Sequence, residues 1–412
     1  MLKSEALVVL GEGSFPVGRL IFETDGRRAH STFVYDEDWI NNPIGFDLAP
    51  DMPRSLTPFH AAPEGRHGDG RDVFAGPFTD SAPDSWGRKL IRRVRGEGVN
   101  EFDYLLAIDD KSRHGALRFL NPQGGLFFPD QPPVPRLAEL DDLRAIAARY
   151  ERDPDGAEAE ARDLVGAAGS LGGARPKANI IDGDDLWIAK FTSIEDSWPV
   201  EQLEIATLSL AQAVGLRTPQ ARLELAASSH PVALIKRFDR RKNNRIPYIS
   251  VRTILGKKGS DHGYYTDIAD ALRHISVAPD QDLLELWKRL LFTVLITNTD
   301  DHLQNHGFLY ARNNRWRLSP MFDVNPQPRR RPILETGISQ IHGFEPTIEA
   351  VIDAAPFFDI EEASAQDMAK KMAIIISSTW EKTLQHHGIT GPTRDLCVAA
   401  FEHQRMEAAL SL

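Results

Sequence analysis

A run of apolar residues at helical spacing, leading directly into a short acidic segment, constrains the fold of this chain most. The stripe predicts a long buried helix, and it comprises Leu283, Trp287, Leu290, Leu291, Val294 and Leu295. The polar run Asn298 to Asn305 follows immediately, and a predicted strand from Arg315 to Phe322 then leads to Asp323. We therefore expect a rigid helix to position the first acidic segment and a returning strand to bring Asp323 beside it.

The order and spacing of Asp300, Asn305 and Asp323 match those of the catalytic aspartate, metal-binding asparagine and metal-binding aspartate of kinases. Phosphoryl transfer needs a carboxylate to orient the attacking hydroxyl and hard oxygen ligands to hold Mg²⁺. The alternative interpretation is an acidic turn, with Asp and Asn present for turn formation alone. For Asp301 and His302 the sequence indicates no role beyond shaping the loop.

Length and composition describe an ordinary globular protein. A chain of 412 residues predicts two or three subdomains, and 42% hydrophobic with 26% charged residues is typical of such proteins. The net charge of -11 argues against nonspecific nucleic-acid binding as the main task. The basic run at 329–331 is explained equally by a solvated loop or by a phosphate contact.

The cysteine content and the length of the apolar runs indicate in which cellular compartment the protein is expected. Cys397 is the single cysteine, which excludes a disulfide framework and a cysteine metal site. The N-terminal segment has too short an apolar run for a signal peptide, and no stretch of 18 or more apolar residues occurs. We therefore expect a cytoplasmic protein with no membrane association.

The organisation of the chain predicts an α+β protein with three subdomains. Residues 1–125 form a β-rich, then helical N-terminal subdomain, in which strands flank a turn at Asp25-Gly26 and a helix opens near Pro83. Residues 126–240 are expected to form a nucleotide-binding lobe, and the Gly- and Pro-rich segment at 121–135 before it predicts a linker or a long surface loop. Residues 241–412 form a mostly helical lobe, with Met368, Met372, Ile375 and Ile376 as expected core.

The nucleotide-binding lobe is predicted from a hairpin and the loop before it. Strands at 178–181 and 186–191 flank a turn at 182–185, and three glycines lie within 169–173 just before them. Glycines let the backbone approach an anion and turn its N–H groups toward it, although a plain flexible turn has the same composition. Lys190, in the second strand, could reach nucleotide phosphates from the sheet, although a single lysine in a strand is more often exposed and without such a role.

Two further elements complete this lobe. A helix is predicted from Pro199 to Val214, and either Glu201 or Glu204 in its first turns could pair with Lys190. Stabilisation of the helix N-terminus explains both glutamates equally well. The apolar strand that starts at Pro231 ends in Lys236 to Phe238, which predicts a hinge against adenine or an ordinary strand with a solvated end.

Taken together, four motifs resemble the HipA family of serine/threonine kinase toxins from bacterial toxin–antitoxin systems. They lie at 170–177, 235–240, 298–305 and 318–326, in the order in which that family has them. The segments 76–78 and 83–87 are also similar to the family's N-terminal subdomain, so the resemblance spans nearly the whole chain. It implies a two-lobed, protein-kinase-like fold with a β-rich N-terminal subdomain and a mostly helical C-terminal lobe.

The resemblance also implies roles for single residues. Asp300 would orient or deprotonate the acceptor hydroxyl, Asn305 and Asp323 would bind Mg²⁺, and Lys190 would contact the ATP phosphates. The remaining ATP-binding residues would be Ser170, Gly172, Gly173, Ala174 and Lys177 in the phosphate loop, and Lys236, Phe238 and Asp239 at the hinge. Ser170 matches the position that such kinases autophosphorylate, and a phosphate there would expel the loop from the ATP site. Pro176 lacks an N–H, which leaves the number of cradling amides open.

Partners follow from the same resemblance. It implies a small helix-turn-helix, HipB-like antitoxin, with operator DNA reached only through that antitoxin, and a protein substrate such as an aminoacyl-tRNA synthetase. Two alternatives remain at the level of sequence: a catalytically idle module that holds an antitoxin on DNA, and a small-molecule or lipid kinase on a related scaffold.

Overall fold

The chain is a mixed α+β protein that divides into two compact units. A computed structural model describes residues 2–63, 70–130, 132–169, 173–242, 244–258, 261–329 and 331–412. Unit 1 comprises Met1–Ile194, Lys236–Asp261 and Leu309–Asn314, and unit 2 comprises Glu195–Ile235, His262–Phe308 and Arg315–Leu412. The chain thus crosses between the units several times, within β9 and β13 among other places.

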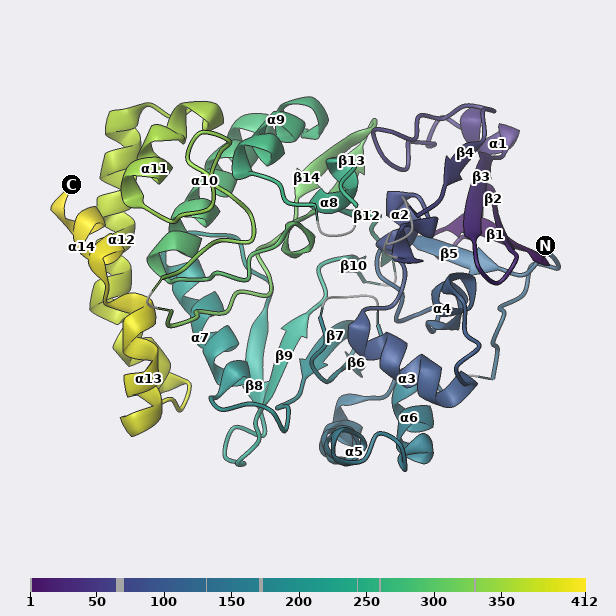
Figure 1. The fold of residues 1–412 in the computed structure, drawn as a ribbon, viewed down its shortest axis with the longest axis horizontal. Coiled ribbons are helices and arrows are strands. Elements are labelled where there is room, and N and C mark those ends of the chain that lie inside the picture. Colours follow the sequence, from purple (N-terminus) through teal and green to yellow (C-terminus); the bar gives the residue numbers. More distant parts are fainter. Residues whose placement is uncertain are drawn as a thin grey trace. The chain divides into compact units, whose positions relative to one another are not determined.

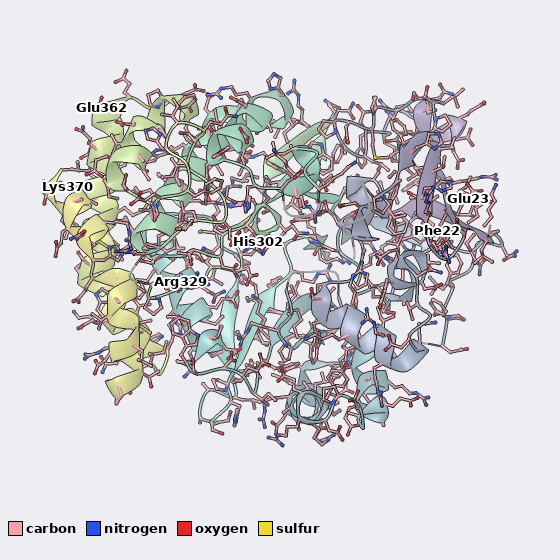
Figure 2. All side chains as sticks on the ribbon, in the orientation of Figure 1. Phe22, Glu23, His302, Arg329, Glu362 and Lys370 are labelled. Atoms are coloured by element: carbon pink, nitrogen blue, oxygen red, sulfur yellow. The ribbon has the colours of Figure 1, made fainter. Side chains whose placement is uncertain are left out.

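The first part of unit 1 is an antiparallel sheet with the strand order β4-β3-β2-β1-β5 (Figure 1). Its strands are β1 (Leu2–Leu10), β2 (Phe15–Thr24), β3 (Ala29–Tyr35), β4 (Phe59–Ala61) and β5 (Leu117–Leu120). Phe22 is buried, whereas its neighbour Glu23 is half-buried on the opposite face, as the period of two along a strand requires (Figure 2). Asp25 Oδ1 accepts from the Arg27 and Arg28 amides at 2.9 and 2.7 Å, so the predicted β-rich start and its turn are confirmed.

The helices of unit 1 lie between the later strands of this sheet and after it along the chain. They are α1 (Glu37–Ile40), η1 (Gly70–Val73), α2 (Gly76–Thr79), α3 (Ser85–Arg95), α4 (Glu101–Ala107), η2 (Leu137–Glu139), α5 (Leu140–Arg152), α6 (Glu158–Val165) and α8 (Val251–Ile254). The helix predicted to open near Pro83 is α3, which begins at Ser85 because Asp84 Oδ1 accepts from the Gly87 amide at 2.7 Å. The described part of the predicted linker at 121–135 contains no helix or strand.

The predicted hairpin of the nucleotide-binding lobe is present. β6 (Lys177–Asp182) and β7 (Asp185–Lys190) pair antiparallel, and Gly183 takes a positive φ of 60° in the turn between them. Three short strands complete unit 1, namely β10 (Arg240–Arg241), β11 (Asn244–Arg245) and β12 (Tyr248–Ser250).

Unit 2 is mostly helical. Its helices are α7 (Val200–Ala213), α9 (Tyr265–Ile275), α10 (Pro279–Leu295), η3 (Leu303–Asn305), α11 (Ile348–Asp353), η4 (Ala355–Phe358), α12 (Glu362–His386), α13 (Gly391–Phe401) and α14 (Gln404–Ser411). Its strands are β8 (Ala221–Glu224), β14 (Arg315–Leu318), β9 (Val232–Lys236) up to Ile235, and the first two residues of β13 (Gly307–Arg312). The apolar stripe predicted to be a buried helix is α10, in which Trp287 is fully buried and donates from Nε1 to Val351 O at 3.0 Å.

One strand is shorter than predicted. We expected a strand from Arg315 to Phe322, but β14 ends at Leu318. Pro320 has no N–H to give to a ladder, and the carbonyl of Ser319 accepts from the buried guanidinium of Arg289 at 2.6 Å. The segment from Ser319 to Asp323 is therefore irregular rather than extended along the strand.

The C-terminal helices pack as one layer of unit 2. The 25-residue helix α12 contacts α7, α13 and α14, and Figure 1 draws α14 beside it at the C-terminus. Met372 and Ile376 are buried as predicted, but Met368 and Ile375 are only half-buried, because they lie at the edge of the helix face that Ala365, Ala369, Met372 and Ile376 bury. Within the described part of the chain, no helix is at once long and apolar enough to cross a bilayer.

Candidate active site

The candidate catalytic loop begins with a strained residue at the end of α10. Thr297 has a φ of 56°, a left-handed conformation that a β-branched residue rarely adopts. Its hydroxyl accepts from Arg405 Nη2 at 2.8 Å and donates to Ala400 O at 3.1 Å, while Gln327 N donates to its carbonyl at 2.9 Å. The C-terminal helices thus hold the turn that directs the chain into the loop.

Asp300 and Asn305 are joined within the loop. Asn305 is buried, and its Nδ2 donates to the Asp300 carbonyl at 3.0 Å. His302, labelled in Figure 2, caps the short helix η3, and its amide also donates to the Asp300 carbonyl at 3.0 Å. Since the amide nitrogen of Asn305 faces the loop backbone, its amide oxygen is the atom that remains for a cation.

The Asp300 carboxylate lies in an acidic environment although the residue as a whole is exposed. Loss of solvent around the carboxylate raises the pKa of Asp300 above its ordinary value. The positive potential of His302 lowers this pKa, whereas the negative charges of Asp323 and Glu335 raise it further. A raised pKa favours a carboxyl group that can accept a proton, which is the property of a general base.

Asp301, the next residue, is buried and has a different environment. His306 Nε2 lies 3.0 Å from its Oδ2, and the Tyr265 hydroxyl donates to the same oxygen. Burial would raise the pKa of Asp301, but His306 and these hydrogen bonds lower it below the ordinary value. Asp301 is therefore an ionised buried group that ties the loop to α9.

Asp323 lies on a second segment packed against the loop. Met321 N donates to Arg217 O at 2.7 Å before it, and Asn325 N donates to Asn298 Oδ1 at 3.4 Å after it. Asp323 itself has a φ of 55°, a conformation that Asp and Asn tolerate better than other non-glycine residues. The predicted proximity of Asp323 to Asp300 is thus present in unit 2, by way of an irregular segment instead of a strand.

The oxygen atoms near Asp323 fit a hard cation. Asn325 Nδ2 donates to Asp323 Oδ1 at 3.4 Å, while Asn325 Oδ1 is buried and has no hydrogen-bond partner among the described residues. Asn298 Nδ2 and His302 Nδ1 are likewise buried and unpartnered in the described part of the chain. No group of three or more His, Cys, Asp or Glu able to hold a metal occurs among the described residues. The candidate ligands are the Asp323 carboxylate and the amide oxygens of Asn305 and Asn325, and oxygen atoms of this kind suit Mg²⁺.

The structure describes only part of the predicted phosphate loop, which belongs to unit 1. Ser170 and Gly172 lie outside the described residues, whereas Gly173 has a φ of 91° and Ala174 is exposed. Lys177 is buried, and its Nζ donates to Asp84 Oδ2 at 3.1 Å and to Gly173 O at 3.2 Å. The ammonium group therefore closes the end of the loop, and its contact with ATP stays a prediction.

Lys190 ends β7, where its Cα is paired with that of Lys177. Its proposed partners, Glu201 and Glu204, are both buried on α7 of unit 2. The choice between the two glutamates stays open.

The predicted hinge residues have different surroundings. Lys236 Nζ donates to Asp185 Oδ2 at 2.5 Å, and the Phe238 ring lies 6.2 Å from the His114 ring. Asp239 is buried in an ion-pair cluster, where it accepts from Arg237 Nη2 at 2.6 Å and from Arg240 Nη1 at 2.7 Å.

The contacts of Asp239 indicate a structural role. It also accepts from the Gly115 amide at 2.7 Å, and the two guanidinium groups lower its pKa strongly although burial alone would raise it. Its role in ATP binding remains a prediction without a contact that supports it.

Sequence reasoning missed several residues that this geometry brings forward. Tyr265 and His306 carried no motif signal because their importance lies in contacts with Asp301, 36 and 5 residues away. Asp84 belongs to the segment at 83–87 that resembles the family's N-terminal subdomain, but its contact with Lys177 joins residues 93 positions apart. The sequence could indicate that Asp84 caps a helix through one carboxylate oxygen. It could not indicate that the other oxygen binds Lys177.

Comparisons with known proteins bear on both units. A HipA N-terminal domain model matches residues 7–120, and a HipA-like C-terminal domain model matches residues 169–387. A solved structure of Shewanella oneidensis MR-1 HipA, in a complex with HipB and its operator DNA, covers 99% of this chain and 99% of its own, with a TM-score of 0.65 and 18% identity. This is a likeness of fold.

Two curated relatives add to these matches. A Haemophilus influenzae protein named "Putative kinase" is 26% identical over 185 residues, which is 39% of this chain and 54% of that protein, so the chain spans about half of that relative's length. "Putative kinase Y4mE" from Sinorhizobium fredii is 25% identical over 343 residues, which is 74% of this chain and 75% of that protein.

Proposed function

Because this chain belongs to the HipA family, two of whose domain models match most of its length, we propose that it is an ATP-dependent serine/threonine protein kinase that acts as the toxin of a toxin–antitoxin pair. One observation carries the proposal: Asn305 Nδ2 binds the Asp300 carbonyl at 3.0 Å, and the segment that holds Asp323 is joined to the start of the same loop, where Asn325 N donates to Asn298 Oδ1 at 3.4 Å. This is the set of groups that phosphoryl transfer requires.

The Asp300 carboxylate is proposed to orient the acceptor hydroxyl and to take its proton. The residue as a whole is exposed, so a substrate can reach it, and the raised pKa of its partly desolvated carboxylate suits proton transfer. The backbone of the same residue is held by Asn305 and His302, which keeps the carboxylate in one position. Positioning of this kind is the main protein contribution to phosphoryl transfer.

Mg²⁺ is proposed to bind at Asn305 and Asp323. The Asn305 amide oxygen and the Asp323 carboxylate would hold it, and the buried, unpartnered Asn325 Oδ1 adds to the oxygen-rich surroundings. When bound, the ion would neutralise charge on the ATP phosphates. Lys190, with Gly173, Ala174 and the residues before them, is proposed to contact those phosphates.

The partner and the target are also part of the proposal. The Shewanella structure contains HipA together with HipB and operator DNA, and by analogy we propose a small helix-turn-helix antitoxin as partner of this chain. The net charge of -11 supports contact with operator DNA only through that antitoxin. A protein of the translation machinery, such as an aminoacyl-tRNA synthetase, is the proposed substrate, and its phosphorylation would inhibit translation.

Autophosphorylation at Ser170 is the proposed means of self-inactivation. A dianionic group on the loop would repel the ATP phosphates and would expel the loop from the site. Gly173 at the end of the loop, with a φ of 91°, provides a backbone position that can change conformation at low cost.

The test is incubation of the full chain with labelled ATP and Mg²⁺, followed by mapping of phosphate by mass spectrometry. We expect phosphate on Ser170 in the wild-type chain and none in Asp300→Gln, and we expect a phosphorylated protein when a cell lysate is added. Absence of transfer to any protein would contradict the proposal. Transfer to lipids or small molecules instead would favour a different kinase class, and a wild-type chain that binds an antitoxin but matches Asp300→Gln would favour an idle module.

A further inference from the structure

The segment Pro83 to Gly87, at the start of α3, touches both ends of the glycine-rich loop. It lies within the N-terminal domain match at 7–120, whereas the loop opens the C-terminal domain match at 169–387. Both belong to unit 1. The kinase function proposed above gives this segment no role.

The first contact is a buried ion pair. Lys177 Nζ lies 3.1 Å from Asp84 Oδ2, and the two side chains are only 6% and 4% exposed. Lys177 Nζ also donates to the Gly173 carbonyl at 3.2 Å, so the same ammonium group fixes the last part of the loop to itself and to α3. Asp84 uses its other oxygen, Oδ1, to cap α3 through the Gly87 amide at 2.7 Å.

The second contact is made by a tryptophan. Trp86 is 2% exposed, and its Nε1 donates to the Lys177 carbonyl at 3.0 Å while its backbone amide donates to the Gly173 carbonyl at 3.3 Å. The Trp86 ring is held in turn by an edge contact with Tyr150 at 5.5 Å. Trp86 therefore binds the backbone on the C-terminal side of the loop at two points, once through its ring N–H and once through its own backbone amide.

The third contact lies at the N-terminal end of the loop and depends on glycine. A Cβ atom at Gly87 would lie 3.2 Å from the Gly169 carbonyl, and one at Gly169 would lie 2.6 Å from Asn179 Nδ2. Helix α3, residue 169 and strand β6 therefore approach each other so closely that a side chain at either glycine would require a neighbouring group to shift. Both ends of the loop are thus fixed, at 169 and at 173–177.

We propose that residues 83–87 are a positioning element of the nucleotide-binding loop, which makes the N-terminal domain a part of the ATP site instead of a separate module. Asp84 and Trp86 act through the loop and do not touch the nucleotide. The proposal rests on the kinase function in one respect, namely that the loop binds the phosphates of ATP. It predicts that weakening this element lowers the affinity for ATP before it lowers the rate of chemistry.

The test uses the full chain with two substitutions that retain most of the local structure. Asp84→Asn keeps an oxygen that can cap α3 but removes the charge that Lys177 faces, and Trp86→Phe keeps the ring but removes the Nε1 donor. We expect each to raise the KM for ATP about tenfold with kcat changed by less than about threefold, as loss of one positioning contact implies. Hydrogen exchange of residues 173–178 without ATP should become faster in both.

A matched control is Asp103→Asn, which alters the capping box of α4 in the same domain, where Asp103 Oδ2 accepts from the Asn100 amide at 3.0 Å. It should leave the KM for ATP and exchange at 173–178 unchanged. If Asp84→Asn does not fold, Trp86→Phe carries the test.

The outcomes separate this proposal from the kinase function. An unchanged KM for ATP together with unchanged exchange at 173–178 in both variants overturns the positioning role. A loss confined to kcat also contradicts it. A wild-type chain that neither binds nor uses ATP overturns the kinase function, and the exchange measurement then decides alone whether residues 83–87 hold the loop.

Discussion

His306 Nε2 lies 3.0 Å from Asp301 Oδ2, and this contact closes the candidate catalytic loop on itself. Asp301 follows the proposed base Asp300, and His306 follows the proposed metal ligand Asn305. The contact therefore fixes the distance between the two functional ends of the loop. The Tyr265 hydroxyl, which donates to the same carboxylate oxygen, attaches this closed loop to α9.

Asp301→Asn should lower kcat by about 100-fold, because a small displacement of a positioned catalytic group has an effect of that order. The Asn amide has one acceptor oxygen, and its N–H₂ group cannot accept from Tyr265 or His306, which both face the Asp301 carboxylate. The KM for ATP should change little, since the loop that is proposed to bind the phosphates belongs to unit 1. Steady-state kinetics at saturating Mg²⁺ measures both parameters.

The control for this change is Asp267→Asn, which replaces another aspartate of unit 2 in the capping box of α9. It should leave kcat unchanged. An Asp301→Asn enzyme with the wild-type kcat would show that the contact with His306 does not position the loop.

Asp323→Asn should raise the Mg²⁺ concentration needed for half-maximal activity by about tenfold or more, because it removes the carboxylate proposed to bind the ion. Asn also tolerates the left-handed conformation, so the substitution tests the charge without straining the backbone, whose φ is 55°. The measurement is activity as a function of Mg²⁺ concentration. Asp359→Asn is a matched control, since Asp359 has a φ of 59° on the exposed surface of unit 2. Equal Mg²⁺ requirements for the two variants would remove Asp323 from the metal site.

Glu285→Ala should destabilise the chain by about 3–5 kcal/mol, because it leaves a buried guanidinium without its carboxylate. Arg289 is fully buried, and Glu285 Oε1 accepts from its Nη2 at 2.8 Å. Urea unfolding followed by circular dichroism measures the change. Glu362→Ala, on the exposed start of α12, should change the free energy of unfolding by no more than about 0.5 kcal/mol. A Glu285→Ala midpoint equal to that of this control would mean that the ion pair contributes nothing to stability.

Protection of α14 should fall as the pH is lowered. Burial, and then the charge of Arg405, lowers the pKa of His403 to about 4. In the folded chain the neutral ring accepts from the Met406 amide at Nδ1, at 3.1 Å, and so caps α14. Between pH values near the ordinary pKa of about 6.5 and the folded value, His403 binds a proton when α14 is unfolded but not when it is folded. The contribution of His403 to the stability of α14 is therefore complete above about pH 6.5 and is lost as the pH falls.

Hydrogen-exchange protection factors of Gln404–Ser411 at about pH 7 and about pH 4.5 measure this effect. His403→Asn keeps an N-cap acceptor without a titrating ring, so its protection should depend less on pH. Protection that is equal at both pH values in the wild-type chain would contradict the role of His403.

The sequence was sufficient to predict those parts of the site that depend on local patterns. The apolar stripe of α10 and the turn at Asp182 to Asp185 follow directly from spacing and turn chemistry. The proximity of Asp323 to the loop was also predicted, although β14 ends at Leu318 because Pro320 cannot continue a ladder.

Contacts between distant residues could not be predicted in this way. Asp239 stands at the end of an apolar strand, where a solvated or ligand-facing carboxylate is expected, yet the guanidinium groups of Arg237 and Arg240 enclose it. Lys177 ends the glycine-rich loop, and its contact with ATP stays a prediction, but the ion pair of its ammonium group with Asp84 could not be foreseen from the sequence. In both places the partner is determined by tertiary packing, which no local pattern encodes.

Transfer of labelled phosphate from ATP by the wild-type chain and by Asp300→Asn, with ATP binding measured on the same samples, tests the central claim most directly. We predict that both proteins bind ATP with similar affinity and that Asp300→Asn transfers phosphate about 10²- to 10⁴-fold more slowly, as loss of a general base implies. Equal transfer rates for the two proteins, or no transfer by the wild-type chain in the presence of Mg²⁺ and a cell lysate, would contradict the assignment of Asp300 as the catalytic base of a kinase.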